Sequence, residues 1–464
     1  MTTAQPVLGL LTVTSDGGAQ WWSDRVPAIA PVEVPVGTSC VISVDAHDPA
    51  LALGVTAAPG ADLALLDTAI GTPEFAARIA DLRAVGGGEN VLAAPTLTPP
   101  FAQLAAVCAA DRWTMHPVHA GALLVDRAVA AHAVGDDTGA HRLFAYAEDA
   151  LCELTADCLA AGTSAVVAER LAVALAAAQG AGLDGPDVLE LAQQLTAWTP
   201  FGGADLADPY LWLVAAEADV AQDAGALTVA STYLDLESVP PRVIAWGGAA
   251  HAEIMLEHDH DTDRVQVTAS LAAAVDVRSR DVRQLFAYVS DVDTGHVLAT
   301  APMRVSGHAV TANLPALGHD PHQLHGGLYT AGTPLEDLRT DPVGRCLAET
   351  DRYLVEAWNH LRASSVAAAT VSPTAGPVAL EAAARARRDQ LARASTAVAN
   401  GRIRLEDELD VLASYAIYPD LADVSDLLHA RLDALERFAA ELDADGSQRA
   451  ARPLLVELIP PDDL

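Results

Sequence analysis

The sequence predicts a multi-domain α+β protein with an N-terminal α/β region, an α-helical block, an antiparallel β-sandwich and C-terminal helices with a leucine seam (Leu421, Leu428, Leu435 and Leu442). Its 464 residues are enough for several domains with their own cores. A hydrophobic fraction of 51% and a charged fraction of 19% are typical of a globular chain. Strand-like and helix-like apolar patterns alternate in separate blocks, which sets the expected order of the parts.

Residues 1–135 are expected to form the first domain, an α/β or α+β unit. VLGLLTV and SCVISV are short β-branched runs between Gly, Pro and Asp residues, so both are predicted strands. Helical spacing starts near Ala61, and two short helices are expected to end at the glycines of residues 86–88.

Residues 136–238 are expected to form the helical block. Between residues 141 and 160 an apolar stripe recurs every three or four positions, at Leu143, Ala147, Leu151, Leu154 and Cys158. Further helices are expected at residues 163–179, 186–198 and 208–225. We find no fixed repeat period of the kind that helical-repeat proteins show.

Residues 239–335 follow Pro240-Pro241 and are expected to form the antiparallel β-sandwich. They hold six or seven strand-length runs, connected by turn-forming sequences such as HDHDTD at residues 258–263. In RVQVTASL the alternation of apolar and polar residues predicts which side chains face inward. These are Val265, Val267, Ala269 and Leu271.

Residues 345–464 are expected to be helical again, with a linker at residues 364–377 and helices at residues 378–399 and 402–417. The leucine seam follows, with a period of seven residues that is typical of coiled-coil packing. Arg431 interrupts the second apolar position of this repeat. Two interpretations are open: the seam packs on the 402–417 helix as a hairpin, or it pairs two chains into a homo-oligomer.

The sequence is interpreted as having only one local basic cluster, formed by Arg385, Arg387 and Arg388. It is either a solvated helix face with salt bridges or a docking patch for an acidic partner. The chain as a whole has 62 acidic residues against 27 basic ones and a net charge of −35. This balance argues against binding to nucleic acid or to an anionic membrane, because both require a surplus of basic side chains.

All 27 basic residues are arginine, and lysine is absent from the chain. The absence has two interpretations: codon bias with an acidic surface, or selection against the lysine amine in a protein that works beside a lysine-modifying machine. It also excludes a Walker-type phosphate loop and Schiff-base chemistry, both of which need lysine. Five cysteines without a CxxC pair, and a start without a signal-peptide pattern, predict a cytoplasmic protein.

Two groups of histidines are the candidate metal ligands of the sequence. HDPHQLH places His319, His322 and His325 three residues apart, and His258 and His260 alternate with aspartates. Imidazole and carboxylate groups bind metals, but solvated loops have the same composition, so no cofactor is predicted. Asp-Thr-Gly occurs at residues 137–139 and 293–295, and both are expected to be turns rather than halves of an aspartic-protease site. We interpret His116 and His119 as structural.

The segment VPPRVIAWGGAAHAEIMLEHDHDTDRVQVTASL resembles a β-module of accessory proteins of actinobacterial conflict systems, those associated with caspase-like proteases and TPR proteins. The resemblance covers residues 238–330, contains no catalytic motif and transfers no functional residue. It implies a role in sensing or regulating a defence effector.

The sequence therefore favours a non-enzymatic, cytoplasmic regulatory or adaptor protein that acts through protein–protein contacts. One alternative is a hydrolase with an unrecognised His/Asp site at His319, Asp320, His322 and His325. Another is a structural subunit of a larger assembly.

Overall fold

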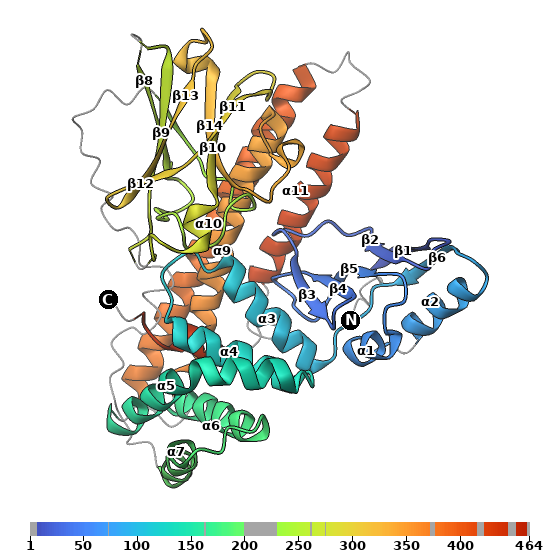
Figure 1. Cartoon of the computed structure of the whole chain (residues 1–464), viewed down its shortest axis with the longest axis vertical. Coiled ribbons are helices and arrows are strands. Elements are labelled where there is room, and N and C mark those ends of the chain that lie inside the picture. Colours follow the sequence, from blue (N-terminus) through green and yellow to red (C-terminus); the bar gives the residue numbers. More distant parts are fainter. Residues whose placement is uncertain are drawn as a thin grey trace.

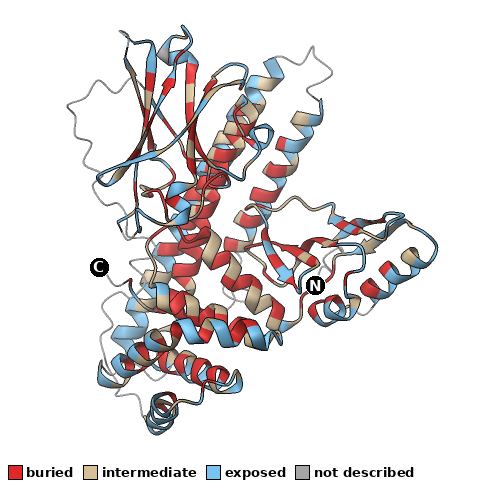
Figure 2. Cartoon of the chain, in the orientation of Figure 1, coloured by how far each residue is buried: buried red, intermediate tan, exposed pale blue. Residues whose placement is uncertain are grey.

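The computed structural model describes residues 7–72, 74–161, 164–198, 230–259, 262–273, 275–371, 376–414, 422–443 and 452–461. It confirms a multi-domain α+β architecture with antiparallel sheets. The parts are arranged around one long helix, α9 (Pro342–Ala369), which is largely buried (Figures 1 and 2). None of the helices among these residues has both the length and the apolar character that a membrane crossing requires.

The N-terminal sheet has the strand order β3-β4-β5-β2-β1-β6, and every adjacent pair is antiparallel. Its strands are β1 (Leu8–Val13), β2 (Ala19–Ser23), β3 (Val32–Val36), β4 (Cys40–Val44), β5 (Ala52–Ala57) and β6 (Gly88–Ala93). One face packs against α1 (Leu63–Ala69), α2 (Glu74–Ala84) and α3 (Pro99–Trp113). Trp21 on this face is fully buried and meets Phe75 of α2 edge-on. The antiparallel pairing makes this unit α+β.

The helical block consists of α4 (Ala120–Ala133), α5 (Asp137–Ala161), α6 (Ala165–Gly180) and α7 (Pro186–Ala197). In α5 the predicted stripe is buried at Ala147, Leu151, Leu154 and Cys158. The turn expected at Asp137-Thr138-Gly139 is wrong, because these residues form the first turn of α5. Asp136 accepts a hydrogen bond from the Gly139 N–H and thereby caps the helix. The helix predicted at residues 208–225 lies outside the described residues.

The β-sandwich packs a sheet of order β11-β10-β14 against a sheet of order β12-β13-β9-β8-β7. The strands are β7 (Ala230–Thr232), β8 (Ile254–Asp259), β9 (Arg264–Ser270), β10 (Leu285–Asp291), β11 (Val297–Pro302), β12 (Arg304–Ser306), β13 (Ala309–Pro315) and β14 (Leu324–Thr330). β7 precedes Pro240 in the chain yet pairs with β8, so the sheet begins earlier than the predicted boundary at residue 239.

The register predicted for β9 is confirmed. Val265, Val267 and Ala269 are at most 2% exposed, and Leu271 is 6% exposed. The exposed turn predicted at residues 258–263 is wrong at its start, because His258 and Asp259 still belong to β8 and the His258 side chain is only 7% exposed. Thr262 and Asp263, which lead into β9, are exposed as expected. Asp293-Thr294-Gly295 forms a turn between β10 and β11, where Asp291 accepts hydrogen bonds from the N–H groups of Asp293 and Thr294.

The C-terminal part contains α9, α10 (Pro377–Ser414), α11 (Ala422–Asp443) and the short α12 (Leu455–Leu458). The predicted linker at residues 364–377 is wrong at its start, because α9 continues to Ala369 and buries Val366 and Ala367. The helices predicted at residues 378–399 and 402–417 are one helix as far as Ser414, where the described residues end. Gly401 lies inside this helix, and a Cβ there would make ordinary van der Waals contacts of 3.4–3.7 Å with Tyr353, Leu435 and Thr350.

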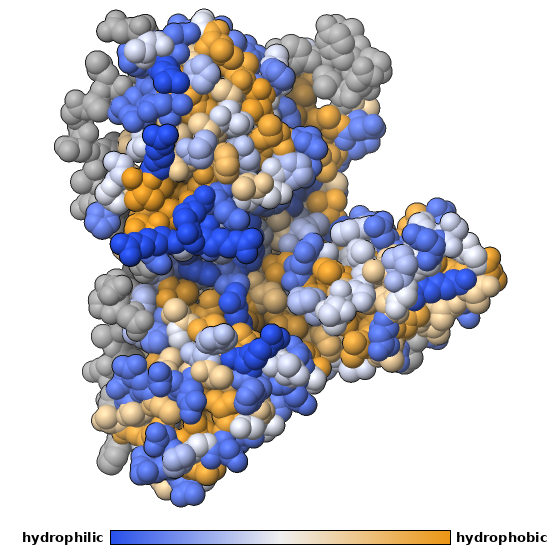
Figure 3. Space-filling model, viewed as in Figure 1, coloured by the Kyte–Doolittle hydropathy of each residue, from blue (hydrophilic) through white to orange (hydrophobic). Residues whose placement is uncertain are grey.

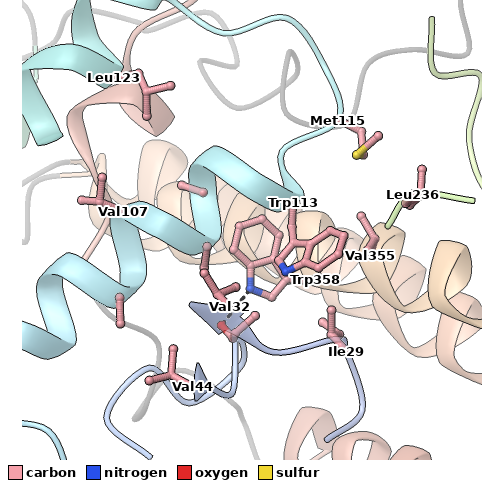
Figure 4. Packing of buried hydrophobic residues seen from close by; sticks show 14 of the residues in the cluster. Ile29, Val32, Val44, Val107, Trp113, Met115, Leu123, Leu236, Val355 and Trp358 are labelled. Carbon is pink, nitrogen blue, oxygen red and sulfur yellow. Dashed lines mark hydrogen bonds between the residues drawn. The ribbon is translucent and has the colours of Figure 1, made fainter. Parts of the chain in front are cut away.

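Two tryptophans join α9 to the N-terminal part of the chain (Figure 4). Trp113 at the end of α3 and Trp358 of α9 lie together in one apolar cluster with Ile29 and Val32. The indole N–H of Trp358 donates a hydrogen bond of 3.0 Å to the carbonyl of Ala46. The core is therefore continuous between the sheet and the central helix.

Candidate functional site

The structure does not assemble the predicted metal ligands. His319 lies 3.7 Å from a carboxylate oxygen of Asp291, and His258 lies 3.8 Å from one of Asp263. His322 belongs to a short 3-10 helix before β14, and desolvation lowers the pKa of His325 to about 3. Among the residues that the structure describes, no three His, Cys, Asp or Glu side chains are placed to hold a metal. His260 lies outside them.

The leucine seam lies inside the chain's own helical core. Leu428 and Leu435 of α11 are fully buried and Leu442 is 4% exposed, while Leu421 is outside the described residues. α11 packs along α10, which is the hairpin arrangement. Arg431, which interrupts the repeat, is buried with them. It pairs with Asp351 of α9 and donates a hydrogen bond to the carbonyl of Pro27.

The arginine cluster of α10 is at the surface. Arg385 and Arg388 are exposed, Arg387 is half-buried, and Arg385 lies 3.7 Å from Glu381. It is not the sole basic cluster of the sequence, because residues 278–283 contain Arg278, Arg280 and Arg283, all exposed. On the face seen in Figure 3, strongly hydrophilic side chains gather in a band below the β-sandwich.

The candidate site is a polar cavity of about 460 Å³, lined by four segments that are far apart in the sequence. They are the loop between α3 and α4, which carries His116, the loop of residues 246–251 before β8, one face of α9 and one face of α10. A cavity where several parts of a chain meet and polar groups converge is the ordinary form of a small-molecule site.

Two groups of α9 face each other in the cavity. The His360 ring lies with Nδ1 2.8 Å from the amide oxygen of Gln390, which can only accept. Nδ1 therefore carries the proton, and Nε2 of the neutral ring is an acceptor. A carboxylate oxygen of Glu356 lies 3.9 Å from this Nε2, and the other one accepts a 2.6 Å hydrogen bond from the Ala249 N–H.

Asn359 lies between them along the helix and is 4% exposed. Its Nδ2 donates to the carbonyl oxygens of Trp113, at 2.9 Å, and Val355, at 2.8 Å. Its Oδ1 is buried and has no hydrogen-bond partner within the described structure. Such an atom costs free energy unless a ligand or solvent molecule supplies a donor.

Burial keeps His116 and His360 neutral. It lowers the pKa of His116 to about 4, and the nearby His360 adds to this effect. Burial also lowers the pKa of His360, against the opposing influence of the Gln390 hydrogen bond and the Glu356 charge. At neutral pH the charged side chains lining the cavity are Glu356 and, on the exposed face of α10, Arg393.

This arrangement suits binding more than nucleophilic catalysis. Among the described residues that line the cavity, Thr396 has the sole hydroxyl group, and it donates to the Ala392 carbonyl of its own helix. Residues that line the cavity carry hydrogen-bond acceptors without a donor: Asn359 Oδ1, and His360 Nε2 with the Glu356 oxygen that faces it.

Sequence reasoning missed this site. From the sequence His116 is interpreted as structural, and Glu356, Asn359 and His360 are not among the candidate site residues. A usable signal is present, because Glu356, Asn359 and His360 are spaced i, i+3 and i+4 and so share a face of the predicted helix. Gln390 and Ala249, which hydrogen-bond to His360 and Glu356, lie on other segments of the chain, so no local sequence pattern points to them.

The comparisons with known proteins add no relative: no family model, curated protein or solved structure matches the chain.

Proposed function

We propose that this protein is a non-enzymatic, cytoplasmic adaptor that binds another protein on the open face of its N-terminal sheet. The observation that carries the proposal is an exposed apolar patch made by Leu8, Leu10, Trp22 and Val91. Their exposed fractions are 41%, 46%, 49% and 62%. Contiguous apolar patches on a folded surface commonly mark interaction sites.

The strand register makes these side chains neighbours. Leu10 pairs with Trp22 on β2 and with Val91 on β6, and Leu8 pairs with Ala93. Side chains of paired residues point to the same face of a sheet, so the patch is continuous across three strands. The opposite face is already covered by α1, α2 and α3. The sheet and these helices project to one side of the molecule (Figure 1).

Trp22 is held in place by its neighbour. A Cβ at Gly54 would lie 2.4 Å from Cζ3 of Trp22, so the ring packs closely over the glycine of β5. A large aromatic side chain that is half exposed and positioned in this way is a typical anchor of a protein interface.

The rim of the patch indicates the chemistry of the partner. Asp24 and Glu89 are exposed beside it, at the Leu8 and Val91 ends. The chain also has a net charge of −35, which attracts basic partners over distance. The occupant that fits is an apolar segment of another protein flanked by Lys or Arg.

Other features support the cytoplasmic adaptor interpretation. All five cysteines are free, in keeping with a reducing compartment. The resemblance of residues 238–330 to accessory modules of conflict systems makes a defence effector the partner we propose.

Site-specific photocrosslinking in the native host tests the proposal. A crosslinking amino acid replaces Leu10, and the same residue at Val305, which is 44% exposed on β12, serves as the matched control. We expect a heterologous adduct at position 10 that is lost when Trp22→Asp is added, and whose crosslinked peptide contains basic residues. An adduct with a second copy of the chain, or equal yields at both positions, would overturn it.

A further inference from the structure

We propose that the cavity between α9, α10, the α3–α4 loop and residues 246–251 binds a small zwitterion with a primary ammonium group and a carboxylate, that is, a free amino acid or a short peptide. This inference rests on the geometry of the cavity and is independent of the adaptor proposal.

The cavity has hydrogen-bond acceptors without donors, and these indicate that the ligand carries an ammonium group. Asn359 Oδ1 is buried without a partner, and His360 Nε2 and a Glu356 oxygen face each other at 3.9 Å. Two acceptors at this separation cannot bond directly, whereas one nitrogen about 2.8 Å from each fits between them and directs a separate N–H to each. An ammonium group supplies three donors, which equals the number of acceptors.

The sign of the charge follows from the same groups. The Glu356 carboxylate is the charge next to these acceptors, and the low pKa of His116 leaves that ring uncharged at neutral pH. An anion at this point would face the Glu356 carboxylate and two neutral rings, whereas Arg393, the cation of the cavity lining, lies on the exposed face of α10. A metal ion does not fit either, since the described residues offer no set of three ligands.

The carboxylate is assigned by Arg393. It lines the cavity from α10, next to Ala392 and Thr396. Within the described parts of the chain Arg393 has no ion-pair partner. A guanidinium group binds a carboxylate through paired hydrogen bonds, so a ligand that spans Glu356 and Arg393 has both charges of an amino acid.

The glycines of the 246–251 loop shape the wall. Gly248 has a φ of 94°, a conformation that side chains other than glycine rarely adopt. A Cβ there would lie 3.8 Å from the Glu356 carboxylate and 3.7 Å from His251. This turn presents the Ala249 N–H to Glu356 and thereby fixes the carboxylate that holds the ammonium group.

Calorimetric titration of the full chain tests the assignment. The probes are the common amino acids, each at up to about 5 mM, with leucine accompanied by isoamylamine, which lacks the carboxylate, and 4-methylvalerate, which lacks the amine. We expect at least one amino acid to bind and leucine to bind more tightly than isoamylamine. We expect no binding of 4-methylvalerate or inorganic phosphate.

Variants then separate the two ends of the ligand. Glu356→Gln is expected to weaken binding of the amino acid and of the amine about tenfold or more, because it removes the charge partner of the ammonium group. Arg393→Ser is expected to weaken binding of the amino acid but not of the amine. Arg385→Ser, on the same helix outside the cavity, is the matched control and leaves both unchanged.

A spectroscopic readout guards against misfolding of a variant. In the wild-type chain, a ligand donor on Nε2 of His360 shifts the ¹⁵N resonance of that nitrogen, so the bound amino acid is expected to change it. Absence of binding by every amino acid and amine, tightest binding by phosphate or 4-methylvalerate, or equal loss in Glu356→Gln and Arg385→Ser would overturn the proposal.

Discussion

Helix α9 carries two polar clusters one turn apart, and they differ in how completely their hydrogen bonds are made. Arg352 is fully buried, yet all of its nitrogen atoms have partners. Its guanidinium group makes a bidentate pair with Glu253, at 2.6 and 2.7 Å, and donates to the carbonyl groups of the loop before β8. The rings of Trp246 and Tyr233 pack over it.

The second cluster, Glu356, Asn359 and His360, faces the same loop but keeps acceptors without donors. The Ala249 N–H satisfies one oxygen of Glu356 and Gln390 satisfies one side of His360, while Asn359 Oδ1 has no partner among the described residues. The two clusters therefore differ in how many of their hydrogen bonds are made, and the second one leaves acceptors that a ligand can use.

The other buried charges around α9 are also paired, although Nε of Arg431 has no hydrogen-bond partner among the described residues. Arg339 pairs with Asp235 and Asp351, and Arg431 of α11 pairs with Asp351 from the other side. Although desolvation opposes it, the charge of Asp351 and the contacts with Asp235 raise the pKa of Arg339 above its usual range. These pairs connect α9 to the β-sandwich and to α11, so they position the parts that line the cavity.

The largest effect is expected from breaking the saturated cluster. Arg352→Met leaves the Glu253 carboxylate buried without its partner, which should lower the free energy of unfolding by about 3–5 kcal/mol. Equilibrium denaturation measures this. Adding Glu253→Gln should recover part of the loss, and a loss below about 1 kcal/mol in the single variant would show that the cluster does not stabilise the fold.

The leucine seam extends the comparison to apolar side chains. Leu435→Ala opens a cavity between α10 and α11 and is expected to cost about 2–5 kcal/mol. Leu427→Ala, at a position on the same helix that is 46% exposed, should cost less than about 0.5 kcal/mol. Denaturation together with light scattering checks both. If Leu435→Ala instead dissociated an oligomer without loss of stability, the seam would pair two chains.

Asp126 is a buried carboxylate that accepts hydrogen bonds from the backbone N–H groups of Leu455 and Val456. Burial raises its pKa to about 7. Between about pH 4 and 7 the folded chain therefore holds a proton there that the unfolded chain has released. The contribution of Asp126 to stability falls as pH rises through this range.

Asp126→Asn removes this titration. The free energy of unfolding of the wild type relative to the variant should fall by on the order of 1 kcal/mol per pH unit from pH 4 to 7. Denaturation curves at several pH values measure it, with Asp433→Asn, at an exposed position of α11, as the matched control. A difference that does not change with pH would contradict the raised pKa.

The smallest effect is expected where side chains are exposed and make few contacts. Replacing both Arg385 and Arg388 by Lys keeps the charge and should change stability by less than about 0.5 kcal/mol. The same variant tests the absence of lysine. If the protein works beside a lysine-modifying machine, intact-mass measurement in the native host will show a modification. An unchanged mass would favour codon bias.

The sequence by itself determined the features that depend on local periodicity. The alternation in RVQVTASL set the inward face of β9, and the leucines at period seven set the buried face of α11. Both succeed because a strand or helix repeats its geometry over a few residues, so neighbours in the chain report the face to be buried. The overall α+β class follows from the same patterns.

Only the tertiary structure decided the partners of the polar residues. Arg431 interrupts the apolar repeat in the sequence and is an ion-pair partner of Asp351 in the structure, and the two helices expected at residues 378–399 and 402–417 are joined through Gly401. The cavity needs His360 beside Gln390 and Glu356 beside Ala249, which lie on different segments of the chain. Hydrogen bonds and charges act through space, so residues distant in sequence form the site that no local pattern could predict.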